Sequence, residues 1–132
     1  MNPKIFLSYS HQDAELAGGL RTALERLGAQ TFDPSANVRA GDDIRKKIIE
    51  GIKKSDFVLL LVSSDAGSFR SWADYEVGSA SALDKDVWVM KPNSLSIRDL
   101  PINFAGFHTL DFDPKAPDKA AKRLLSSVKA AA

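Results

Sequence analysis

The chain contains no cysteine among its 132 residues, which excludes a disulfide framework and a thiolate metal site and fits a reducing compartment. It also lacks an excess of either charge, because 18 Lys and Arg side chains oppose 17 Asp and Glu, a formal net charge of +1. A nucleic-acid-binding surface usually needs a concentrated basic face, so we expect no direct contact with nucleic acid. The four lysines of KKIIEGIKK fit a solvated helix face better.

Long hydrophobic runs are missing as well. The longest, FVLLLV at 57–62, is far too short to cross a bilayer. The N-terminal MNPKIFLSYS turns polar after a few apolar residues, unlike a secretory signal. We therefore expect a cytoplasmic protein without a membrane partner. The length favours one domain, residues 1–132, and the terminal KAAA fits either a natural end or a piece excised from a longer protein.

Short apolar segments alternate with amphipathic ones along the chain. Strands are expected at 4–8, 29–33, 56–64, 86–90 and 107–112, and helices at 13–27, from Asp42 or Asp43 through Ile52, at 71–83 and at 118–131. Gly28 suits the left-handed position that ends the first helix. The apolar DFVLLLVSS is typical of a central parallel strand. This order predicts an α/β fold, a single flavodoxin-like domain with a parallel sheet of about five strands and helices on both faces.

In such folds, ligands bind at the carboxyl ends of the strands, and here those ends are polar and rich in hydroxyls. The turn after the first strand has no G-x-G-x-x-G motif, and no P-loop motif is present. His11 and His108 have no neighbouring ligand set in the sequence, so no metal site is expected.

A phosphoacceptor receiver domain has the same element order, and Lys91-Pro92 after the fourth strand would suit it. Such a domain needs adjacent acids for Mg²⁺ at the end of the first strand. The chain has Ser8, Tyr9 and Ser10 there, which argues against a receiver domain.

Three stretches, in order, resemble the TIR domain family of bacterial type: IFLSYSHQD, GDDIRKKIIEGIKKSDFVLLLVS and SFRSWADYEVGSA. The resemblance covers residues 4 to about 90 by motif and the last third by element order alone. Two features depart from the family pattern. Ala40 stands where animal adaptor members carry a proline, and no Phe-Trp pair occurs around INFAGFHTL. Both departures argue against adaptor surfaces of the animal type.

The resemblance implies two alternative functions. Some TIR domains cut the bond between nicotinamide and ribose in NAD⁺, giving nicotinamide and ADP-ribose or a cyclic isomer, and need a glutamate on the third helix. Glu76 matches that position, with NAD⁺ as substrate and no cofactor. Other members are non-enzymatic scaffolds, for which the loop 33–42 and the third helix are the expected contact surfaces. The family also implies self-assembly, a sensor or effector protein as partner, and a role in antiphage defence or signalling.

One glutamate is chemically sufficient for this cleavage. Glycosidases usually need a second carboxyl group to protonate the leaving group, but nicotinamide leaves NAD⁺ as a neutral base. The remaining task is to stabilise positive charge on the ribose, and a well-placed group supplies about 2.7–4 kcal/mol. Glu76 lies near the start of its predicted helix, where the dipole favours the ionised form. We therefore expect an anionic Glu76 at neutral pH.

Five further residues are candidates for substrate binding. Trp72 precedes Glu76 by one helical turn, where an indole would stack on the substrate with a cation–π contribution of about 0.5–2 kcal/mol, or simply pack in the core. Tyr9, Ser10 and Asp33 end the first two strands; contact with ribose or phosphates and ordinary turn hydrogen bonding both remain open. Arg39 has the charge to meet a diphosphate, and an ordinary surface arginine fits equally well.

Overall fold

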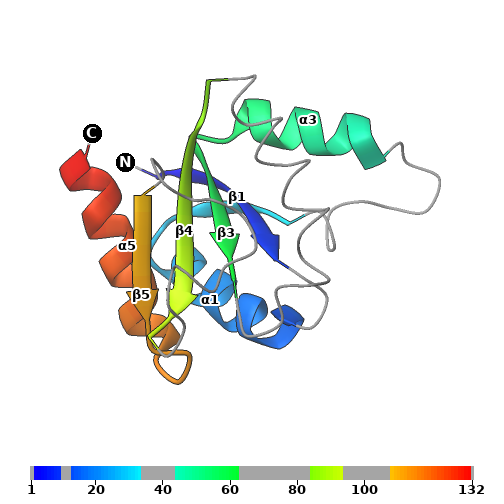
Figure 1. Cartoon of the computed structure of the whole chain (residues 1–132). Coiled ribbons are helices and arrows are strands. Elements are labelled where there is room, and N and C mark those ends of the chain that lie inside the picture. The colour runs from blue at the N-terminus through cyan, green and yellow to red at the C-terminus, as the bar shows by residue number, and fades with distance from the viewer. Residues whose placement is uncertain (1, 10–12, 34–43, 63–83, 94–107, 132) are drawn as a thin grey trace.

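The computed structural model describes residues 2–9, 13–33, 44–62, 84–93 and 108–131. These ranges contain five strands, β1 (Lys4–Tyr9), β2 (Gln30–Phe32), β3 (Phe57–Leu61), β4 (Asp86–Pro92) and β5 (His108–Phe112). They also contain the helices α1 (Ala14–Arg26), α3 (Ile44–Lys54) and α5 (Pro117–Ala131). The strands form one parallel sheet in the order β2-β1-β3-β4-β5 (Figure 1). This confirms the predicted α/β fold.

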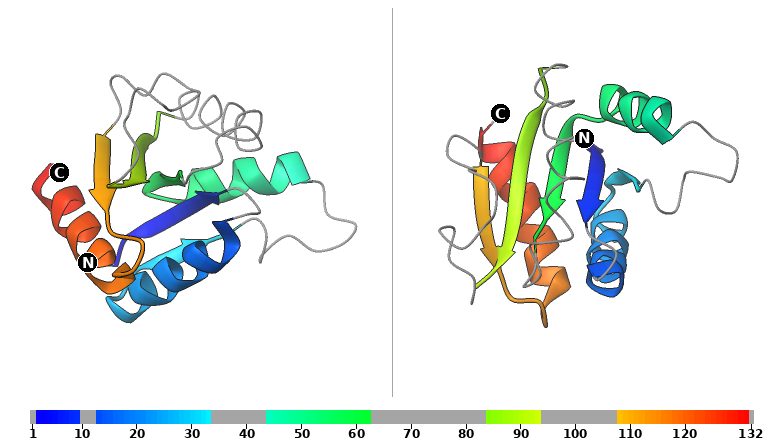
Figure 2. Two further views of the ribbon diagram at one scale, coloured as in Figure 1. Left: turned by 60° about the horizontal axis from the view of Figure 1, so that its bottom comes forward. Right: turned by 45° about the vertical axis from the view of Figure 1, so that its right-hand side comes forward.

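Helices cover both faces of the sheet. α1 and α5 pack against each other on one face, and α3 lies on the opposite face (Figure 2). All five residues of β3 are buried, as expected for a central parallel strand between two helical layers. Because successive side chains of a strand point to opposite faces, Leu59 and Leu61 join the core under α1 and α5, while Val58 and Leu60 lie on the other side.

A close approach of α3 to the sheet depends on a glycine. The rings of Phe6 in β1 and Phe32 in β2 stack with centroids 5.4 Å apart. A Cβ atom added to Gly51 of α3 would lie only 2.6 Å from Cδ1 and Cε1 of Phe32. The absence of a side chain at Gly51 therefore lets α3 rest directly on this aromatic pair, with Ile48 and Ile52 buried alongside.

The ends of the elements test the predictions in detail. Gly28 adopts φ +96° after α1, as predicted. α5 begins one residue early, at Pro117, a residue type suited to the first helical position. β4 extends two residues beyond the predicted end at 90, because Lys91 and Pro92 pair in register with Asp111 and Phe112 of β5. The predicted capping residues 42–43 and the predicted helix 71–83 lie outside the described residues.

None of the described helices combines the length and the apolar content that a membrane span requires.

Candidate functional site at the carboxyl edge of the sheet

The strand order reverses between β1 and β3, because the chain moves from β1 outward to β2 and then returns past β1 to β3. In open α/β sheets, ligands bind outside the carboxyl ends of the strands at such a switch point. The last two residues of β1, Ser8 and Tyr9, pair in register with Leu60 and Leu61 of β3. The end of β1 is therefore the part of the described structure best placed to form a site.

Tyr9 and Asp33 meet at this edge. The Tyr9 hydroxyl donates a hydrogen bond of 2.7 Å to Oδ2 of Asp33, which follows β2. Asp33 is only 4% exposed, and Tyr9 is partly buried against the core. A hydrogen bond to a carboxylate is shorter and stronger than one between neutral groups, so this contact fixes the Tyr9 hydroxyl at the edge of the sheet.

A third side chain, Arg21 of α1, extends this pair into a network. Its Nη1 atom lies 3.9 Å from Oδ2 of Asp33, and its Nε atom donates to Oε1 of Glu25 at 3.0 Å and to Oγ1 of Thr31 at 3.1 Å. The Thr31 hydroxyl also donates to Oε1 of Glu25 at 2.8 Å. The hydrogen bonds from Thr31 and then Arg21 lower the pKa of Glu25 below its ordinary value. The network ties α1 to β2 directly behind Asp33.

The sequence prediction did not include Arg21 or Thr31. The i, i+4 spacing of Arg21 and Glu25 was a usable signal for their ion pair. The contact with Asp33 had no such signal, because it depends on how α1 packs against β2.

A second polar cluster lies at the other end of the same edge. Lys91, at the end of β4, is only 7% exposed and forms an ion pair with Asp111 of β5. Arg123 of α5 donates from Nη1 to the Asp111 carbonyl oxygen at 2.8 Å. A cavity of about 310 Å³ lies beside these groups, next to Asn93 and Asp113. The ion pair with Asp111 accounts for a lysine at this buried position, so Lys91 gives no evidence for a receiver domain.

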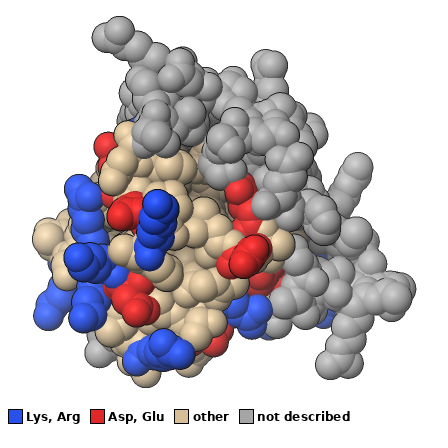
Figure 3. All heavy atoms as spheres, turned by 90° about the horizontal axis from the view of Figure 1, so that it is seen from below, with Lys and Arg blue, Asp and Glu red and all other residues tan. Residues whose placement is uncertain are grey.

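Charges of both signs occupy this end of the molecule. Viewed onto the carboxyl edge, Lys and Arg side chains gather on the side of α5, with acidic side chains among them (Figure 3). α5 carries the exposed basic residues Lys119, Lys122 and Arg123 and the exposed acidic residue Asp118, and the exposed Asp113 directly follows β5. Mixed charges at short range largely cancel, so these residues make no patch of a single sign.

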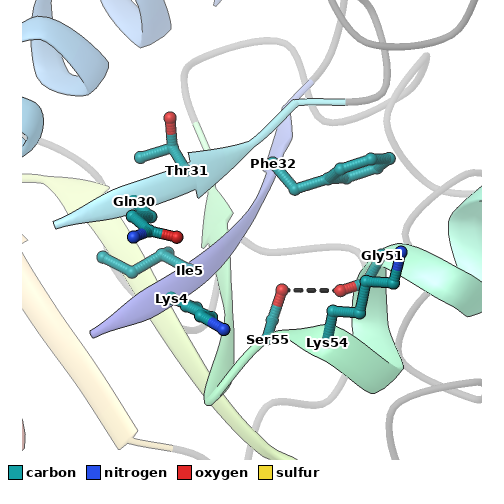
Figure 4. A pocket seen from close by; sticks show the side chains of 8 residues that line it. All are labelled: Lys4, Ile5, Gln30, Thr31, Phe32, Gly51, Lys54 and Ser55. Atoms are coloured by element: carbon teal, nitrogen blue, oxygen red, sulfur yellow. Dashed lines mark hydrogen bonds between the residues drawn. The ribbon is translucent and has the colours of Figure 1, made fainter. Parts of the chain in front are cut away.

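Another cavity, of about 230 Å³, opens on the α3 face (Figure 4). It lies between the starts of β1 and β2 and the end of α3, where Ser55 donates a hydrogen bond of 2.6 Å to the Gly51 carbonyl oxygen. The residues that line it include no carboxylate and no imidazole for acid–base chemistry. We therefore assign the candidate site to the carboxyl edge and not to this cavity.

The remaining predicted site residues, Ser10, Arg39, Trp72 and Glu76, lie outside the described residues, so their roles stay predictions. Within the described ranges, no group of three or more His, Asp or Glu side chains is arranged to hold a metal ion. His108 has another contact, because its ring stacks on Trp88 of the neighbouring strand with centroids 4.2 Å apart.

Comparison with known proteins identifies the family. The family model for the TIR domain matches residues 5–125, and the chain therefore belongs to the TIR domain family. The 2′ cyclic ADP-D-ribose synthase AbTIR of Acinetobacter baumannii is 26% identical over 120 residues, which cover 89% of this chain and 41% of that protein. The probable 2′ cyclic ADP-D-ribose synthase TcpB of Brucella abortus is 30% identical over 80 residues, 60% of this chain and 32% of the relative. The chain thus spans less than half the length of either relative.

Solved structures share the fold. The TIR domains of the activated Roq1 resistosome superpose with a TM-score of 0.58 at 21% identity, covering 70% of this chain and 58% of theirs. A 2-deoxyribosyltransferase of Bacillus psychrosaccharolyticus gives a TM-score of 0.63 at 19% identity, covering 87% and 90%. The CMP N-glycosidase BcmB of Clostridium botulinum gives 0.59 at 18%, covering 92% and 97%. At these identities, the similarity concerns the fold alone.

Proposed function

We propose that this chain is an NAD⁺ nucleosidase of the TIR type, which cleaves the bond between nicotinamide and ribose. The observation that carries the proposal is the 26% identity, over 89% of the chain, to a TIR protein named as a 2′ cyclic ADP-D-ribose synthase. A cyclic ADP-ribose can form from NAD⁺ only if nicotinamide leaves the ribose, so the bond that breaks is the same for cyclisation and for hydrolysis.

Glu76 is the catalytic residue in this proposal. Its carboxylate stabilises the positive charge that develops on the ribose as nicotinamide leaves with the electron pair of the broken bond. The cation is then captured by water, which gives ADP-ribose, or by a hydroxyl of the same molecule, which gives a cyclic isomer. In either case the attacking oxygen loses a proton. Access of water to the reacting carbon decides between the two products.

Tyr9 and Asp33 support this chemistry as substrate-binding residues. Asp33 holds the Tyr9 hydroxyl through the 2.7 Å hydrogen bond. A tyrosine hydroxyl that donates one hydrogen bond still has lone pairs on its oxygen, which accept hydrogen bonds from other groups. We assign this oxygen to a ribose hydroxyl of the substrate. Ser10, Trp72 and Arg39 complete the proposed binding site, with Trp72 against the nicotinamide ring and Arg39 at the diphosphate.

The test is release of nicotinamide. Concentrated protein is incubated with NAD⁺, nicotinamide is followed by chromatography, and mass spectrometry identifies the second product. Because the proposal includes self-assembly through TIR contacts, the rate should rise more than in proportion to protein concentration. If no nicotinamide appears at any concentration, or with a crowding agent, the enzyme is rejected. The chain would then be a TIR scaffold that uses the loop 33–42 and the predicted helix 71–83 as contact surfaces.

The biological setting is part of the same proposal. We place the protein in the cytoplasm, in bacterial antiphage defence or signalling, with a sensor or effector protein and other TIR domains as partners. Neither nucleic acid nor a membrane is among the proposed partners, and NAD⁺ is consumed as a substrate.

A further inference from the structure

One buried hydroxyl at the end of β1 has no hydrogen bond. Ser8 is 1% exposed, and its Oγ atom is the only buried side-chain nitrogen or oxygen among the described residues without a hydrogen-bond partner. Native proteins rarely bury a polar atom without a partner, because the group loses its hydrogen bonds to water and gains none in return. An alanine at this position would avoid that cost, so the hydroxyl calls for an explanation.

Ser8 lies where a ligand would supply the missing hydrogen bond. Ser8 pairs with Leu60 across the β1–β3 switch point, and it directly precedes Tyr9, whose hydroxyl binds Asp33. Ile5 and Leu7 point into the core under α1 and α5, so Phe6 and Ser8 face the side of α3. Ser8 and Tyr9 therefore lie on the two faces of one strand, at the point in the fold where ligands usually bind.

We infer that Ser8 is a substrate-contacting residue whose hydroxyl forms its missing hydrogen bond with a sugar hydroxyl of the bound nucleotide. This inference rests on the proposed function. A serine hydroxyl donates one hydrogen bond and accepts others, as a sugar hydroxyl does. A phosphate is a poor match, because the described neighbours Phe6 and Leu60 are apolar and burying a charge among them is costly.

Burial also defines how the contact forms. Since Ser8 is only 1% exposed, the nucleotide reaches Oγ only when the atoms that cover it in the free protein move on binding. The contact is therefore made in the complex and is absent from the free protein. Removing the hydroxyl should weaken nucleotide binding without lowering the stability of the free protein.

The test compares Ser8→Ala with Ser55→Ala. Ser55 is a matched control, since it is 3% exposed and its hydroxyl donates a hydrogen bond of 2.6 Å to the Gly51 carbonyl oxygen. Thermal unfolding of the free proteins is measured first. Ser55→Ala should lower Tm by about 4 °C, the shift expected for one lost hydrogen bond in a domain of this size. Ser8→Ala should leave Tm unchanged or raise it.

Steady-state kinetics with NAD⁺ then separates binding from folding. Ser8→Ala should raise KM for NAD⁺ about 3- to 10-fold, the effect of losing one hydrogen bond to a ligand, and Ser55→Ala should not. A Ser8→Ala protein that loses Tm as Ser55→Ala does and keeps the wild-type KM would overturn the inference, because Ser8 would then have a structural partner such as a buried water.

A separate readout distinguishes failure of this inference from failure of the proposed function. If the wild-type protein releases no nicotinamide, the rise in Tm that NAD⁺ produces is compared between wild type and Ser8→Ala. A smaller rise in the variant supports the contact even without turnover. Equal rises, or no rise in the wild-type protein, reject it.

Discussion

Asp33 shows how one side chain connects the fold to the candidate site. Its carboxylate is buried, accepts the Tyr9 hydroxyl and lies 3.9 Å from the Arg21 guanidinium. Tyr9 and Asp33 were predictable as candidates because both end strands. Their mutual contact was not, because it depends on the register of β1 and β2, which the sequence does not state. In the sequence, Ser8 served only as an argument against a receiver domain, because it stands where such a domain carries acids. That its hydroxyl has no hydrogen-bond partner can be seen only in the structure.

Replacing Tyr9 by Phe should destabilise the protein by about 1–3 kcal/mol. The change removes a single oxygen and leaves the buried Asp33 carboxylate without the hydrogen bond that Tyr9 donates. Urea unfolding measures the effect, and Asp33→Asn in a double-mutant cycle measures how much of it belongs to the pair. Equal midpoints for Tyr9→Phe and wild type would show that the hydrogen bond contributes nothing to stability.

Gly51 offers a test of packing at a single residue. Gly51→Ala should destabilise the protein by up to about 2 kcal/mol, because overpacking costs about 1–3 kcal/mol and the better helix propensity of alanine returns about 1. The added Cβ atom would lie 2.6 Å from the Phe32 ring. Gly18→Ala in α1 is the control, since its Cβ atom meets nothing within 4 Å and should stabilise the helix. Similar changes in urea midpoint for both variants would refute the packing role of Gly51.

The helices differ in how they are held to the sheet. α5 packs against α1 and buries Ala120, Ala121 and Leu124 in the core on this face of the sheet. Its polar bond to the sheet runs from Arg123 to the Asp111 carbonyl of β5, whereas α1 is joined to β2 by polar bonds through Glu25. The existence and type of each described element followed from hydrophobic periodicity. The end of β4 did not, because its last two residues are polar or proline and are held in the strand by pairing with β5.

The bonds between α1 and β2 should make stability depend on pH. Hydrogen bonds from Thr31 and Arg21 lower the pKa of Glu25 below 4.5, so the folded state binds this proton less readily than the unfolded state. The contribution is therefore present above about pH 4.5 and is lost as pH falls through the folded pKa. Because the Glu25 side chain is 46% exposed, we expect less than about 1 kcal/mol.

Urea midpoints of wild type and Glu25→Gln from pH 7 to pH 3 measure this contribution. The difference should be present at pH 7 and should shrink in acid. Glu15→Gln, which changes an exposed glutamate in the first turn of the same helix, is the control. A difference between Glu25→Gln and wild type that grows as pH falls would contradict the assigned sign.

The fold of the described residues was the most predictable property of the chain. Alternating strands and helices gave the parallel sheet, and three ordered motifs gave the family, which the match over residues 5–125 confirms. Hydrophobic periodicity indicates secondary structure and buried faces, and these together predict the fold. Chemistry depends on side chains brought together from separate strands. For that reason the Tyr9–Asp33 contact, the Arg21 network and the unpaired Ser8 hydroxyl emerged only from the structure.

Nicotinamide release by wild type and Glu76→Gln tests the proposed chemistry most directly. Glutamine keeps the size of the side chain and removes the charge that stabilises the ribose cation. We expect the wild type to release nicotinamide and the variant to be about 10²- to 10³-fold slower at unchanged Tm. A Glu76→Gln protein as fast as wild type would show that residue 76 does not supply the stabilising charge, and no release by either protein would reject the nucleosidase itself.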